Sequence, residues 1–338
     1  HCPCGYRALQ RARGQSKRLC STVTPIRFII LLNLKGSKMR DFTELKKLIA
    51  HFEERKSRAK ERSQSIHGQQ WNFAISGMHC DFENYVCKPL YDFRRVVEPP
   101  GEVELACALR NKVVVSAIAR HSQGISYELA VNNTDFSTQA TWNIGWWLIS
   151  ALRVKTLAEF LVPAVANRSW STIPALNADC EAHLLEDFPL ARRLESPITI
   201  HEADLEWVTE NFLLFSEMLD IPRFRLAVDS LTTCQHLTNL RAILSSLWSG
   251  IESLAGVQTE LRYRLAVSLT SILEPRGPER TGLYHELKRL YDVRSQAVHG
   301  SPASDAKLLK AISHSRRLLS RTICTMVEAG RVFSEKDF

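Results

Sequence analysis

One predicted helix, residues 281–299, carries an arginine and a histidine whose spacing could support chemistry on a phosphate group. With a step of about 100° per residue, its apolar residues gather on one face, and Arg294 lies about 20° from Leu283, in the middle of that face. Those apolar residues are Leu283, Leu287, Leu290, Tyr291, Ala297 and Val298. Because charged side chains are rarely buried without a partner, Arg294 needs an acidic partner or an anionic ligand.

His299 follows Arg294 by five residues and precedes Gly300 and Pro302, which are typical of a helix end. At a helix C-terminus the dipole favours the charged imidazolium, and the ring can turn toward a cleft. The preceding predicted helix, residues 237–255, has an apolar stripe with Glu252 at its flank. We therefore expect Glu252 to pair with Arg294, either to orient it in a site or to neutralise it in the core.

The charge of this part of the chain is unevenly distributed. Residues 276–321 contain ten Lys or Arg and four Asp or Glu, whereas residues 202–275 contain five basic and ten acidic residues. A basic region around Arg294 and His299 could attract phosphates, although a solvated helix face has the same composition.

The segments LYDVRSQAVHG (290–300) and LWSGIESLAG (247–256) resemble the HEPN superfamily, and more closely its Apea-like branch. The mark of that family is an arginine, often followed by a polar residue, with a histidine four to six residues further on, in a helical bundle. Arg294, Ser295 and His299 match it, and the resemblance covers residues 202–330.

The resemblance implies an endoribonuclease that needs neither a metal nor another cofactor, of the kind that acts in defence or as a toxin. Arg294 and His299 would be its catalytic residues, with Glu252 and Ser295 in support. A histidine can move the proton of a ribose 2′-hydroxyl, and an arginine can hold the phosphate by two hydrogen bonds. The products would be a 2′,3′-cyclic phosphate and a 5′-hydroxyl. Members of the family commonly form homodimers, so that two Arg/His pairs face one cleft.

Two other interpretations stay open. The chain could be a non-catalytic HEPN module that binds RNA or a nucleotide or scaffolds a partner. Alternatively, Arg294 could be a structural partner of Glu252, with His299 as a helix cap. His201, His285 and His314 lie in no metal-ligand spacing, and no phosphate-binding glycine loop is present.

The composition narrows the class of protein further. The net charge of +8 comes from residues 1–38, which hold eight basic and no acidic residues, so overall charge does not indicate nucleic-acid binding. The nine cysteines include no C-x-x-C pair, which favours free thiols and a cytoplasmic protein. No apolar run approaches the ~20 residues of a membrane-spanning helix, so we expect no membrane association.

We expect an α+β protein with three parts. Residues 1–38 are a basic leader, either a translated segment before a native start at Met39 or a transit peptide. Residues 39–200 form a mixed domain with a small antiparallel sheet, which could contact an inhibitor or a sensor partner. Residues 201–333 form an all-α, HEPN-like bundle.

The expected elements follow from periodicity and breakers. Strands are expected at WNFAIS (71–76), EVELACALR (102–110), KVVVSAIAR (112–120) and ISYELAV (125–131), and an irregular connection at 166–200. Trp142, Trp146 and Trp147 are expected in the core. The expected helices are 41–66, 137–165, 203–219, 223–234, 237–255, 258–274, 281–299 and 304–329.

Overall fold

The computed structural model describes residues 42–63, 70–132, 137–176, 179–187, 194, 197–256, 261–333 and 337. Its contacts divide the chain into two units, 1–55 and 56–338. The predicted leader and Met39 lie outside the described residues, as do residues 41 and 64–66 of the first predicted helix. Helix α2 (Phe42–Ser63) confirms most of the first predicted helix.

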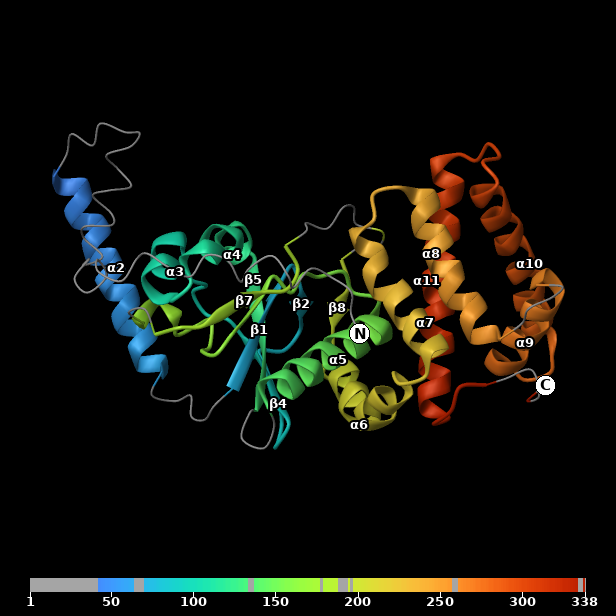
Figure 1. Cartoon of the computed structure of the whole chain (residues 1–338), viewed down its shortest axis with the longest axis horizontal. Helices are drawn as coiled ribbons and strands as arrows, with labels where there is room; N and C mark the ends of the chain where they lie inside the picture. The colour runs from blue at the N-terminus through green and yellow to red at the C-terminus, as the bar shows by residue number, and fades with distance from the viewer. Residues whose placement is uncertain are drawn as a thin grey trace, which may run out of the picture. The chain divides into compact units, whose positions relative to one another are not determined.

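The fold is α+β, as predicted, with a six-stranded antiparallel sheet in the order β3-β4-β5-β1-β6-β7 (Figure 1). Its strands are β1 (Gln70–Ser76), β3 (Asn84–Cys87), β4 (Tyr91–Arg95), β5 (Ile125–Asn132), β6 (Ala164–Ala166) and β7 (Ala182–Leu184). The short strands β2 (His79–Cys80) and β8 (Thr199–Ile200) form a separate parallel pair.

Two of the expected strands are helices instead. EVELACALR forms α3 (Glu102–Ala108), and KVVVSAIAR forms a 3₁₀ turn (Lys112–Val114) followed by α4 (Val115–Ser122). Their buried residues recur at helical spacing, as Leu105 and Ala108 in α3 and Val115 and Ile118 in α4 do. The β-branched residues of KVVVSAIAR were therefore a misleading signal, because tertiary packing overrode it, whereas EVELACALR holds only one such residue, Val103.

Helix α5 (Thr138–Thr156) covers one face of the sheet. On that face Phe73 of β1 lies opposite Leu129 of β5, which in turn lies opposite Phe93 of β4. Gly145 allows a close approach, because a Cβ built there would lie 2.2 Å from the Phe73 ring. The helix ends earlier than the predicted residue 165, at Leu157, whose φ is +59°. The predicted core tryptophans of this helix do pack against the hydrophobic core.

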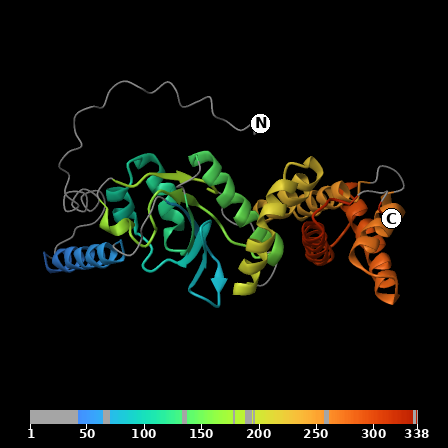
Figure 2. The ribbon, with the colours of Figure 1, turned by 90° about the horizontal axis from the view of Figure 1, so that it is seen from below.

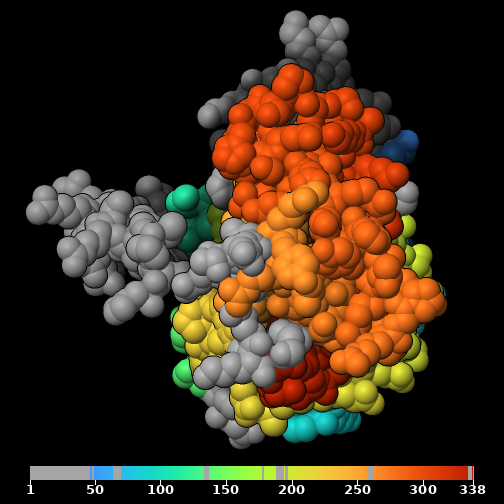
Figure 3. Space-filling model, turned by 90° about the vertical axis from the view of Figure 1, so that its right-hand side faces the viewer, coloured from blue at the N-terminus to red at the C-terminus, as the bar shows by residue number. Residues whose placement is uncertain are grey.

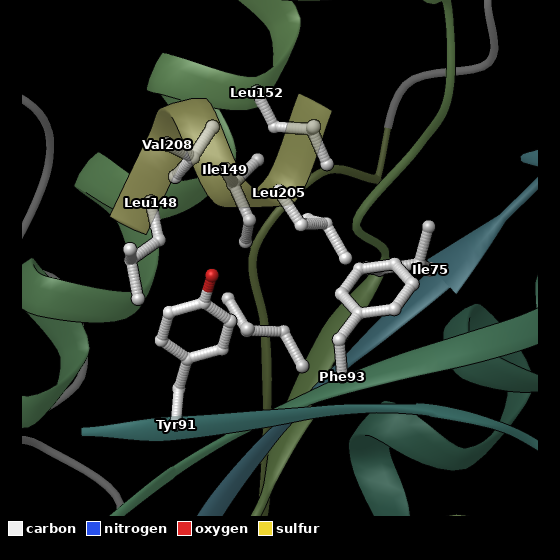
Figure 4. Close-up of a pocket in the computed structure, with 9 residues that line it drawn as sticks. Ile75, Tyr91, Phe93, Leu148, Ile149, Leu152, Leu205 and Val208 are labelled. Atoms are coloured by element: carbon white, nitrogen blue, oxygen red, sulfur yellow. The ribbon is translucent and has the colours of Figure 1, made fainter. Parts of the chain in front are cut away.

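A small apolar hollow lies between the sheet, α5 and α6 (Glu202–Met218), as Figure 4 shows. Its lining residues are apolar or aromatic: Ile75, Tyr91, Phe93, Leu129, Leu148, Ile149, Leu152, Leu205 and Val208. The Tyr91 hydroxyl is hydrogen-bonded to Thr209 at 2.7 Å. The hollow is therefore part of the core.

The opposite face of the sheet carries a buried polar network. Arg94 lies 3.0 Å from the Glu128 carboxylate and donates to Asn72 at 2.9 Å. Glu128 also accepts hydrogen bonds from the Ser169 hydroxyl and the Trp170 backbone, both at 2.7 Å. Burial raises the pKa of Glu128, against the opposing effect of Arg94 and these donors. The network fixes the 169–172 loop on the sheet.

The helical part begins with α6 and continues with α7 (Pro222–Thr233), α8 (Leu240–Ala255), α9 (Leu261–Leu273), α10 (Pro278–Val298) and α11 (Asp305–Glu328). These bounds confirm the predicted helices; residues 258–260 of one of them lie outside the described residues. Helix α11 contacts α5 through α10 and so occupies the centre of the helical part (Figures 1 and 2).

Buried ion pairs link the sheet part, which is the chain before α6 with its strands and α5, to the helical part. Arg153 of α5 lies 2.8 Å from Glu186, which also contacts His236 at 3.3 Å. Arg316 of α11 lies 2.8 Å from Glu159. The division of the chain at residue 200 remains a prediction, and these contacts cross it.

None of the described helices is both long and apolar enough to cross a membrane. Six cysteines within the described residues are free thiols: Cys80, Cys87, Cys107, Cys180, Cys234 and Cys324.

Candidate functional site

Helix α10 ends where the sequence predicts but begins at Pro278, three residues before the predicted start at residue 281. Pro278 occupies the first turn, where its missing N–H is not needed. His299 is the C-terminal cap, and its N–H donates to the Ser295 carbonyl at 3.0 Å. Gly300 has a φ of +75°, the left-handed conformation that favours glycine at this position. The Ser301 N–H then donates to the Gln296 carbonyl at 3.0 Å, which closes the helix end.

Arg294 faces α8 and pairs with Glu252, as the helical phase of the two residues predicts. Its Nη2 lies 3.0 Å from Glu252 Oε1 and donates to Oε2 at 3.1 Å. Each side chain is 21% exposed. The Arg294 guanidinium also lies 5.7 Å from the Tyr291 ring, which is edge-on to Trp248.

The pair is not fully satisfied by its protein partners. Arg294 Nε is buried and has no hydrogen-bond partner among the described residues. Burial raises the pKa of Glu252, while Arg294 opposes that shift. Because Nε is buried, an anion could reach the guanidinium only through its exposed part, at the cost of weakening the bond to Glu252.

His299 is exposed and lies on a different side of α10 from Arg294. Five helical steps correspond to about 140° around the axis, so the two side chains leave the helix in different directions. The structure thus brings Glu252 and Arg294 together and leaves His299 at the exposed end of the helix. Ser295, the other predicted supporting residue, is half-buried, and its backbone carbonyl accepts the His299 N–H.

Sequence reasoning missed Arg241, which fixes the end of α10 that carries His299. Its guanidinium donates to the carbonyls of Gln296 (3.2 Å), Ala297 (3.0 Å) and Ser301 (2.7 Å). Asn239 caps α8 and thereby positions Arg241, because its side chain accepts from the Arg241 N–H at 2.9 Å. Arg241 therefore holds the position of the His299 backbone.

Several other polar residues of the helical part have partners that the sequence did not indicate. Asp292 pairs with Arg262 at 2.7 Å, His314 with Glu286 at 2.5 Å, and His201 with Asp81 at 2.5 Å. These histidines are thus held by carboxylates. Within the described part of the chain, no group of three or more His, Cys, Asp or Glu is placed to hold a metal ion.

The basic residues of 276–321 do not form one uniform surface. Arg316 is buried against Glu159, and Arg321 pairs with Glu274 at 2.8 Å. Five others have exposed positions: Arg276, Arg289, Lys307, Lys310 and Arg317. The predicted basic field is therefore smaller than the count of charges suggests.

Comparisons with known proteins identify no relative: no family model, no curated protein and no solved structure matches this chain. The resemblance to the HEPN superfamily thus stays a hypothesis that rests on the residues around Arg294 and His299.

Proposed function

We propose that this chain is a metal-independent endoribonuclease of HEPN type, with Arg294 and His299 as its catalytic residues and a defence or toxin-type role. The observation that carries the proposal is the end of α10. There the Arg294 guanidinium, which is 21% exposed, lies about 1.4 helical turns from an exposed imidazole, and Arg241 holds the helix end in place.

In the proposed reaction, neutral His299 accepts the proton of a ribose 2′-hydroxyl. The 2′-oxygen then forms a bond to phosphorus, and the bond from phosphorus to the 5′-oxygen breaks. The 5′-oxygen leaves with a proton from a second, protonated His299, which yields a 2′,3′-cyclic phosphate and a 5′-hydroxyl. Arg294 stabilises the charge that grows on the phosphate oxygens.

The reaction as proposed needs two copies of the chain, because each has one His299. A homodimer formed through the helical part would bring the two α10 ends to one cleft. It would also bring the Arg294 of one copy toward the His299 of the other, which compensates for the angle of about 140° between them on a single helix.

A second candidate function is RNA binding without cleavage. The angle of about 140° between Arg294 and His299 favours it, because an arginine that points away from the histidine can contact a phosphate without taking part in cleavage. A cleavage assay separates the two functions.

The assay uses the full chain with labelled single-stranded RNA in excess EDTA. We expect the wild type to leave cyclic phosphate ends, and His299→Ala to cleave at least about 100-fold more slowly, as is typical when a general base is removed. Arg294→Lys, which keeps the charge but not the two-pronged geometry, should also be slow. His79→Ala removes another exposed histidine and should cleave like the wild type.

Two results would contradict the proposal. If His299→Ala cleaves as fast as the wild type, the activity belongs to another site or to a contaminant. If the wild type binds RNA but cleaves none, the binding function replaces the catalytic one.

A further inference from the structure

Tyr263 on α9 is an unusually placed aromatic residue. It is 58% exposed, and it is the only exposed residue among the Phe, Tyr and Trp side chains that the structure describes. Tyrosines normally bury most of their ring, so an exposed ring is more informative than a buried one. The Tyr263 ring is nevertheless braced, because Tyr284 of α10 lies edge-on to it, with 6.3 Å between the ring centroids.

The surroundings of this ring pair are basic. Lys288 Nζ lies 5.1 Å from the centroid of the Tyr284 ring. The neighbouring Arg262 forms an ion pair with Asp292 at 2.7 Å. The Arg262 side chain is 51% exposed and that of Asp292 is 46% exposed. Two cations and one carboxylate thus lie around the two aromatic rings.

Tyr284 and Lys288 lie on the same side of α10 as His299. Counted back from His299 in steps of about 100°, Lys288 falls about 20° away and Tyr284 about 60° away. The rise of about 1.5 Å per residue places them about 16 Å and 22 Å along the helix from His299. Figure 3 faces the side of the molecule on which α9 and α10, in orange, are exposed.

From this arrangement we infer that Tyr263, braced by Tyr284 and flanked by Lys288 and Arg262, is a stacking platform for an unpaired base of single-stranded RNA. The inference rests on the proposed function, since it assigns the surface that holds the RNA a few nucleotides from the bond to be cut. Bases of any sequence offer a flat face for stacking, and the cations attract the backbone. A duplex keeps its bases stacked inside, so the platform selects single strands.

The test measures binding and not cleavage. A fluorescent 2′-O-methyl oligonucleotide without secondary structure has no 2′-hydroxyl to react, and its affinity for the full chain is measured by anisotropy. We expect Tyr263→Ala to bind it about tenfold more weakly or worse, and Tyr263→Phe to bind it like the wild type. Leu213→Ala, which removes another exposed apolar side chain (67% exposed, on α6), should bind it unchanged.

Equal affinity of Tyr263→Ala and the wild type would overturn the inference. So would a change from dimer to monomer in Tyr263→Ala by analytical ultracentrifugation, since Tyr263 would then belong to a contact between copies. A chain that needs Tyr263 for binding but cleaves no natural RNA would support the platform and remove the nuclease. Cleavage that depends on His299 but not on Tyr263 would do the reverse.

Discussion

At the scale of single residues, the end of α10 depends on one arginine from another helix. Arg241 satisfies carbonyls that the helix itself leaves without partners, and its charge is favourable at the negative end of the helix dipole. Replacing it removes three hydrogen bonds at once, although water can reach part of this site.

We therefore expect Arg241→Ala to lower the free energy of unfolding by about 2 kcal/mol, as measured by urea denaturation. Hydrogen exchange in residues 299–304 should accelerate, since the anchor of that segment is lost. Arg289→Ala is the matched control: Arg289 is an exposed arginine on α10 and should change the free energy by less than about 0.5 kcal/mol. An unchanged exchange rate in Arg241→Ala would show that Gly300 alone fixes the helix end.

The part of the site that depends on which face of a helix a residue occupies could be predicted from the sequence. The positions of Arg294 on the apolar face of α10 and of Glu252 at the flank of α8 were enough to predict their pairing. Arg241 could not be found in this way, because its partners are backbone carbonyls 55 to 60 residues away, which carry no residue-type signal. The catalytic role of His299 stays a prediction.

At the scale of elements, the contact between α5 and the sheet depends on a missing side chain. A methyl group on Gly145 would overlap the Phe73 ring, which is itself 1% exposed and has no room to move. The helix would have to shift away from β1 to accommodate it.

We expect Gly145→Ala to destabilise the protein by about 2 kcal/mol or more, as overpacking of a core typically does. Gly282→Ala offers the matched comparison within α10, because a Cβ there meets no atom within 4 Å. That change should stabilise the protein by about 0.5–1 kcal/mol through helix propensity. The midpoint temperatures of thermal unfolding of both variants test these two expectations. A stabilised Gly145→Ala would mean that α5 and β1 are not in close contact.

The long helices and two central strands could be predicted because their apolar periodicity extends over enough residues to be unambiguous. The errors fall on short segments. EVELACALR suits a strand and a helix equally well until Leu105 and Ala108 are seen to be buried together. The β3–β4 pair and the three-residue strands β6 and β7 are too short for a periodic signal, and their pairing partners set their conformation.

At the scale of the whole molecule, a buried cluster of charges links the sheet part to the helical part. Burial alone opposes the ionisation of Glu186, but Arg153, His236 and the Val162 N–H outweigh it and lower its pKa to about 2. In the unfolded chain this carboxyl has its ordinary pKa of 4.5. The stabilisation is therefore complete above that value and is lost as the pH falls toward about 2.

We expect the wild type to unfold at a lower urea concentration at pH 3 than at pH 6. For Glu186→Gln we expect a smaller decrease of this midpoint over the same pH range. At pH 6, Glu186→Gln should cost about 3 kcal/mol, because Arg153 stays buried without its counter-charge. Asp187→Asn removes a carboxylate from a surface pair with Arg120 (60% and 45% exposed) and should cost under about 1 kcal/mol. An acid dependence identical in wild type and Glu186→Gln would assign it to other carboxyls.

Helix α5 belongs to both parts, since it contacts the sheet through Gly145 and also packs against α6, α7 and α11. The two parts are therefore poor candidates for exchange as gene cassettes. A fragment that stops at residue 200 would present the outer face of α5 to water, and a fragment that starts there would lose the surface on which α6 and α11 rest. Recombinant halves should aggregate unless they are produced together, and a recombination that replaced one part would have to supply a compatible α5 with it.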